Sequence, residues 1–131
     1  MDKNKIIRIL SYLAMSISVL GIVMVAMMAF SDPKSVMALV NVEINNTDAY
    51  SSIRGVYGGA GLTIAIAMVY GMFKNLKLSL AFTSLLWGLY AVSRIMTAMV
   101  DGPLGDFGTQ WVYTESFLCI ACLSLYFSNK K

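Results

Sequence analysis

The sequence predicts an all-α integral membrane protein, an up-down four-helix bundle, and three observations lead to this fold class. Hydrophobic residues make up 58% of the 131 residues, charged residues make up 13%, and the mean hydropathy is positive, whereas about 25% of the residues in soluble proteins are charged. Four runs approach the roughly 20 mostly apolar residues of a spanning helix: residues 6–30, 53–73, 78–100 and 111–127. The link between the second and third runs is only four residues long, so these two helices are expected to be antiparallel neighbours. We therefore treat residues 1–131 as a single four-helix transmembrane domain.

The first run, 6–30, is taken as a helix because its apolar part is too long for a secretory signal. Basic residues gather at one side of the predicted bundle: Lys3, Lys5, Arg8, Lys74, Lys77, Lys130 and Lys131. Acidic residues of the links gather at the other side: Asp32, Glu43, Asp48, Asp101 and Asp106. Basic residues flanking spans favour the cytoplasmic side, so both termini are predicted to be cytoplasmic.

The link before the second run, 53–73, opens with Asp32-Pro33, which is typical of an N-cap followed by a proline at the first helical position. Apolar residues follow at helical spacing up to Val40. We expect a short helix at the outer surface here and then a polar turn at residues 45–48.

The second and third runs, 53–73 and 78–100, are separated by a four-residue link that contains Lys74 and Lys77. The link before the last run, 111–127, spans residues 101–108 and is rich in glycine, aspartate and proline, so it is not expected to continue a helix.

Polar and charged residues recur at helical spacing in the outer half of these runs, which predicts a site. An ionisable group inside the hydrocarbon is costly and normally lies paired in the bundle interior. The predicted charge cluster or ligand site comprises Arg54, Tyr57, Trp87, Tyr90, Arg94, Asp101 and Glu115. Two readings stay open: a structural clasp that fixes helix register, and a clasp that also lines a ligand pocket.

Glycines beside Arg54 are expected to serve helix packing, since small residues let helices approach closely in a membrane. They are Gly55, Gly58, Gly59 and Gly61. The pattern lacks the spacing of a phosphate-binding loop and the strand that precedes one.

Several chemistries are not supported by the composition. The chain has no histidine, so the commonest general base and a usual zinc or haem ligand are missing, and no metal site is predicted. Cys119 and Cys122 form a C-x-x-C that invites a thiol-redox reading, but a buried free cysteine also serves as a small apolar residue, and we expect an inert pair. The scattered basic residues report topology and predict no nucleic-acid partner.

These residues together resemble a family of small bacterial membrane proteins, domain of unknown function 4345. The resemblance rests on Arg54-Gly55-Val56-Tyr57-Gly58-Gly59, on Arg94 within Ser93-Arg94-Ile95, on Asp101-Gly102-Pro103 and on Glu115. It implies a four-helix protein of the bacterial cytoplasmic (inner) membrane and brings no established activity. A looser similarity in helix number and size to DoxX-like membrane proteins, some of them associated with quinone-linked sulfur oxidation, keeps a redox role open.

The leading hypothesis is a non-enzymatic membrane protein whose outer-half polar cavity binds a small amphiphile or anion, such as a lipid or quinone, or docks on a larger membrane assembly. No resident cofactor is predicted. Two alternatives stay open: a subunit of a quinone-linked oxidoreductase or lipid-modifying enzyme, and an oligomeric transporter or channel subunit. The lipid bilayer, a homo-oligomer and a larger membrane complex are the expected partners.

Overall fold

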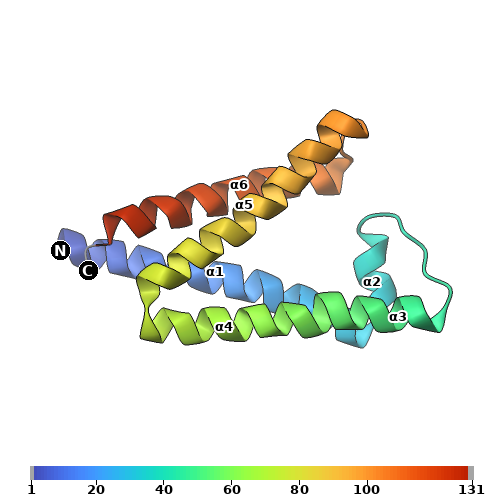
Figure 1. Cartoon of the computed structure of the whole chain (residues 1–131), viewed down its shortest axis with the longest axis horizontal. Helices are drawn as coiled ribbons and strands as arrows, with labels where there is room; N and C mark the ends of the chain where they lie inside the picture. The colour runs from blue at the N-terminus through green and yellow to red at the C-terminus, as the bar shows by residue number, and fades with distance from the viewer. Residues whose placement is uncertain (1, 130–131) are drawn as a thin grey trace. The chain divides into compact units, whose positions relative to one another are not determined.

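The structure, a computed structural model, describes residues 2–129, which contain helices and no strand. In chain order the helices are α1 (Lys3–Ser31), α2 (Pro33–Ala38), α3 (Thr47–Ile53), η1 (Arg54–Ala60), α4 (Gly61–Lys74), α5 (Leu76–Val100) and α6 (Asp106–Ser128) (Figure 1). Because α3, η1 and α4 run on as one helix, Thr47–Lys74, four helices are long and apolar enough to cross a membrane. The all-α prediction is confirmed, while the up-down order and the cytoplasmic termini stay predictions. Lys130 and Lys131, used to predict that orientation, lie outside the described residues.

The short helix after α1 forms where the sequence predicts one. Asp32 is its N-cap and accepts a hydrogen bond from the backbone N–H of Lys34, and Pro33 occupies the first turn, where its missing N–H costs nothing. Asn41 takes the left-handed conformation (φ 56°), and the N–H of Val42 donates to the carbonyl of Met37 at 3.0 Å. This left-handed C-terminal turn satisfies carbonyls that would otherwise lack partners. The position of α2 at the outer surface stays a prediction.

The second long helix begins at Thr47, six residues before the predicted 53, because Asn46 caps it. The Asn46 side chain accepts a hydrogen bond from the N–H of Ala49 at 2.8 Å. The predicted polar turn at 45–48 is therefore too long, since Thr47 and Asp48 already belong to the helix. Residues 54–60 of this helix form a π-helix, which the sequence analysis did not predict. Four glycines in eight residues are the only local signal for it.

The last two long helices also begin before their predicted starts. Asn75 caps α5 by accepting from the N–H of Leu78 at 3.0 Å, so α5 starts at Leu76 rather than at 78. The turn after α5 contains Gly102 in a conformation with positive φ (113°) and ends at Gly105. Residues 106–108, predicted to lie in the link, are helical; Asp106 favours this earlier start because a negative charge stabilises a helix N-terminus.

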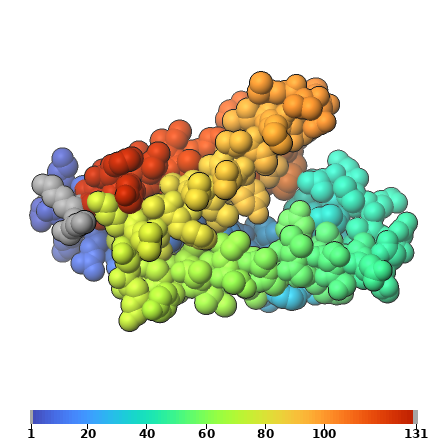
Figure 2. Space-filling view, viewed as in Figure 1, coloured from blue at the N-terminus to red at the C-terminus, as the bar shows by residue number. Residues whose placement is uncertain are grey.

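The described helices form two compact units. Unit 1 comprises α1 up to Ser18 together with the chain from Gly71 onward, and unit 2 comprises Val19–Tyr70. Within unit 1, α5 and α6 pack side by side and antiparallel across the tight turn that joins them (Figure 1). Within unit 2, side chains of α2, the following loop and α3 gather at one end (cyan to green in Figure 2). Their small core contains Ala29, Val36 and Met37. The prediction of a single domain stays a prediction.

Large apolar side chains remain exposed along every long helix. Ile66, Phe73, Leu78, Met99 and Phe117 are all more than 60% exposed. Soluble monomers rarely expose apolar surface on this scale, whereas lipid tails solvate it without cost. The exposure therefore agrees with a multi-pass membrane protein.

Candidate functional site

The ion pair between Arg94 of α5 and Glu115 of α6 is the centre of the candidate site. Arg94 Nε donates to Glu115 Oε2 at 2.7 Å, and Arg94 Nη2 donates to Glu115 Oε1 at 2.9 Å. Both carboxylate oxygens are thus used, in the parallel two-bond geometry that arginine favours with carboxylates. The Glu115 side chain is 1% exposed and the Arg94 side chain 21%. Of the predicted cluster of buried charges, the structure shows this one ion pair.

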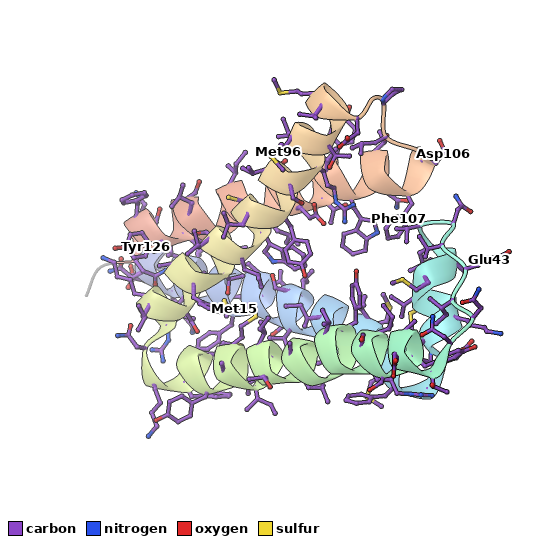
Figure 3. The ribbon with its side chains drawn as sticks, turned by 45° about the vertical axis from the view of Figure 1, so that its right-hand side comes forward. Met15, Glu43, Met96, Asp106, Phe107 and Tyr126 are labelled. Carbon is purple, nitrogen blue, oxygen red and sulfur yellow. The ribbon has the colours of Figure 1, made fainter. Side chains whose placement is uncertain are left out.

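Arg94 keeps hydrogen-bonding capacity beyond this pair. Its third guanidinium nitrogen, Nη1, has no hydrogen-bond partner among residues 2–129, yet no buried polar side-chain atom there lacks one. Nη1 is therefore accessible from outside the protein. The guanidinium carbon lies 5.8 Å from the centre of the Phe107 ring, and Figure 3 shows Phe107 projecting from the start of α6. The site thus combines a fixed cation, an accessible donor and an aromatic wall.

Trp87, two turns before Arg94 on α5, joins that helix to the first half of α1. Its indole N–H donates to Ser18 Oγ at 2.9 Å, and Ser18 Oγ donates to the carbonyl of Ala14 at 3.0 Å. Tyr90 lies beside Trp87 with ring centres 5.9 Å apart and is partly exposed. Trp87 is buried, so of the two rings only that of Tyr90 is exposed on α5.

Two further polar contacts extend the α1 seam of unit 1 away from Arg94. Thr83 Oγ1 donates to the sulfur of Met15 at 3.2 Å, and Asn129 Nδ2 donates to Ser11 Oγ at 2.8 Å. Thr83, Met15 and Ser11 are fully buried. Buried polar groups need such partners, so the seam fixes which face of α1 meets α5.

Asp101, the remaining predicted site residue of unit 1, is the C-cap of α5 and is exposed. It forms no ion pair with the basic residues of the described chain. The structure therefore brings Arg94 and Glu115 together and leaves Asp101 at the helix end.

Arg54 and Tyr57, the other two predicted site residues, belong to unit 2. Arg54 Nε donates to the carbonyl of Phe30 at 3.3 Å, and its guanidinium carbon lies 6.0 Å from the centre of the Tyr50 ring. Tyr57 is 38% exposed. Whether Arg54 and Tyr57 share a site with Arg94 stays a prediction.

The four glycines beside Arg54 differ in what surrounds them. A Cβ placed on Gly58 would lie 2.9 Å from the Phe30 ring, and one on Gly61 would lie 3.3 Å from the Cβ of Ala26. A Cβ on Gly55 would meet nothing within 4 Å, and one on Gly59 would come no closer than 4.0 Å to the carbonyl of Arg54. In unit 2, Gly58 and Gly61 are thus the glycines at the contact with α1.

Neither cysteine forms a disulfide, and the two differ in burial. Cys122 is buried, and Cys119 is partly exposed with its sulfur 3.1 Å from the position of a Cβ on Gly88. Cys119 therefore packs where α6 passes α5. No group of three or more histidine, cysteine or acidic side chains that could hold a metal ion occurs between residues 2 and 129.

Two residues outside the predicted site, Phe107 and Tyr50, contact residues of it, and Lys34 contacts Tyr50. Phe107 was missed because α6 was expected to begin at 111; with a start at Asp106, Phe107 shares a helix face with Glu115 through two four-residue steps. Lys34 and Tyr50 lie far apart in the sequence, but Lys34 Nζ is 5.9 Å from the centre of the same Tyr50 ring that Arg54 approaches. No local pattern indicates that proximity.

A protein-family model matches residues 10–126, and its description is "Domain of unknown function (DUF4345)". The match covers the second and third long helices in full and most of α1 and α6, and it includes every residue of the predicted site. The searches of curated proteins and of solved structures gave no match. The similarity to DoxX-like proteins stays a prediction.

Proposed function

The chain belongs to the DUF4345 family, and from this premise we propose that it is a non-enzymatic, multi-pass protein of the bacterial cytoplasmic membrane that binds the oxygen-bearing head of a small amphiphile at Arg94. The observation that carries the proposal is the Arg94–Glu115 pair with its accessible Nη1 donor. The distribution of basic residues supports the orientation, with both termini in the cytoplasm.

Glu115 prepares Arg94 for this role. An arginine held by two hydrogen bonds has lost its conformational freedom before the ligand arrives, so less entropy is lost on binding. Nη1 then donates to an acceptor oxygen of the ligand. Phe107 shields this hydrogen bond from water, which strengthens it.

The charges around the pair favour a neutral acceptor over a free anion. Glu115 cancels the charge of Arg94, and Asp101 and Asp106 add negative charge at the adjoining ends of α5 and α6. A carbonyl, such as that of a quinone or a lipid ester, accepts a hydrogen bond without repulsion from these carboxylates. The exposed ring of Tyr90, backed by the buried Trp87, supplies an aromatic surface for the apolar part of such a molecule.

Native mass spectrometry of the protein released from its own membrane tests this proposal, with the released small molecules identified. The wild type should carry one amphiphile per chain, and Arg94→Gln should lose it. Arg8→Gln is the matched control, because Arg8 is an exposed arginine beside a tyrosine ring and its loss should leave the adduct in place.

Arg94→Lys separates ligand binding from the structural clasp. Lysine keeps an ion pair with Glu115 but lacks the rigid fork that serves the carboxylate and a ligand together. We expect this variant to fold and to bind the amphiphile more weakly. A wild type without an adduct, beside an Arg94→Gln variant that is merely less stable, would contradict ligand binding and leave the clasp as the role of the pair.

A further inference from the structure

Two cationic side chains of unit 2, Lys34 and Arg54, lie beside one tyrosine. Lys34 Nζ is 5.9 Å and Arg54 Cζ is 6.0 Å from the centre of the Tyr50 ring. Both cationic residues are exposed, and neither forms an ion pair with a carboxylate of the described chain. The pKa of Lys34 is raised by its hydrogen bond to Tyr50 and by the charges of Asp32 and Glu43, yet no carboxylate of the described residues forms an ion pair with either cation.

The end of α1 explains why Arg54 lies there. Phe30 is the last residue but one of α1, and its carbonyl is among the last four of the helix, which have no partner within an α-helix. Arg54 Nε fills that need and brings a positive charge to the negative end of the helix dipole. The guanidinium is thereby fixed, while Nη1 and Nη2 have no hydrogen-bond partner among residues 2–129.

The same contact places this group of side chains at the depth of lipid headgroups. The 29 residues of α1 give a length of about 44 Å at 1.5 Å per residue. The hydrocarbon core of a bilayer is about 30 Å thick. A helix of this length that spans the bilayer has its ends in the headgroup layers, where phospholipid phosphates lie.

From these contacts we infer that Lys34, Tyr50 and Arg54 form a binding site for the phosphate group of an anionic phospholipid. Arg54 supplies two guanidinium nitrogens, Lys34 an exposed ammonium, and Tyr50 a hydroxyl. Arginine and lysine are the usual partners of phosphate. The two nearby carboxylates form no ion pair with Lys34: Asp32 accepts the N-cap hydrogen bond of α2, and Glu43 lies exposed on the loop after α2 (Figure 3).

The test is native mass spectrometry of the full chain in detergent, titrated with phosphatidylglycerol or with zwitterionic phosphatidylcholine. The wild type should bind one phosphatidylglycerol in preference to phosphatidylcholine. Lys34→Gln and Arg54→Gln should each weaken phosphatidylglycerol binding by about 10-fold, because each removes a charge-assisted hydrogen bond. Lys77→Gln is the matched control, since Lys77 is a single cation 5.1 Å from the ring centre of Tyr126, and it should change binding little.

Arg54→Gln also removes the cap of α1, so its helicity is checked by circular dichroism; Lys34→Gln tests the site without that contact. Titration with inorganic phosphate distinguishes the two sources of the anion. If phosphate binds and both variants weaken its binding, the ligand is free phosphate. If phosphate does not bind, the ligand is a lipid headgroup. Unchanged phosphatidylglycerol affinity in a folded Lys34→Gln variant would overturn the proposal. This proposal is independent of the proposed function, since the phospholipid site contains no residue of the Arg94 site. Arg94→Gln should therefore leave phosphatidylglycerol binding intact.

Discussion

The ion pair between α5 and α6 should show a large coupling energy in a double-mutant cycle. Its two hydrogen bonds, at 2.7 and 2.9 Å, are both charge-assisted, and such bonds contribute about 1.5–3 kcal/mol each. Breaking a buried pair by removing one partner costs about 3–5 kcal/mol. The partial exposure of Arg94 (21%) screens its charge, so we expect a coupling near the lower end, about 3 kcal/mol.

The cycle consists of Arg94→Met, Glu115→Leu and the double variant. Glu115→Leu should be the costlier single change, since it leaves a guanidinium that cannot lose its proton, whereas Arg94→Met leaves a carboxyl group that can gain one. The double variant should be more stable than either single variant, because apolar residues of similar volume replace the whole pair.

Unfolding by a denaturing detergent in mixed micelles, followed by tryptophan fluorescence, measures these differences because Trp87 is buried in unit 1. If the losses of the two single variants add in the double variant, so that the coupling is less than about 1 kcal/mol as in exposed pairs, the view that this pair holds α5 to α6 is refuted. The cycle tests the clasp whether or not a ligand binds.

Three further predictions concern packing, the α1 seam and pH, and each is measured as a change in unfolding in mixed micelles. Gly58→Ala should destabilise the protein by about 1–3 kcal/mol because its Cβ would meet the Phe30 ring, whereas Gly55→Ala has free space and should be neutral or stabilising; equal effects would contradict the assignment of Gly58 to the contact with α1. Trp87→Phe should cost about 1–3 kcal/mol by removing the hydrogen bond to Ser18, and Trp111→Phe, which makes no such bond within the described residues, is its control. The pKa of Lys34 is raised above its ordinary 10.5, chiefly by the hydrogen bond to Tyr50. The stability that protonated Lys34 contributes is therefore full below pH 10.5 and is lost as the pH rises through the raised pKa. Lys34→Gln should abolish this alkaline loss of stability, and an alkaline profile unchanged in the variant would contradict the prediction.

The predictability of this fold follows from how strongly each feature is constrained locally. Four long apolar runs can only become spanning helices, so their number and type are readable from composition. Their starts were placed late because Asn46 and Asn75 act as caps from polar stretches that resemble plain turns. A buried charge within such runs needs a partner of opposite charge, so the sequence predicts that Arg94 and Glu115 take part in ion pairing.

Contacts that depend on tertiary geometry were not predictable. Lys34 and Tyr50 meet only because α2 folds back beside α3, and the sequence shows no periodicity linking them. The contact between Trp87 and Ser18 likewise joins the first span to the third. The π-helix at residues 54–60 was missed because helical-face arguments assume 3.6 residues per turn throughout.

The π-helix between α3 and α4 also fixes a rotational register. Its hydrogen bonds close over five residues rather than the four of an α-helix, so the segment holds one residue more than an uninterrupted helix would need. Each residue of an α-helix turns the chain by about 100°. If the same residues closed in the α form without losing one, Arg54 and Tyr50 would turn by about that angle relative to α4. The extra residue therefore sets the rotation at which Arg54 reaches the carbonyl of Phe30.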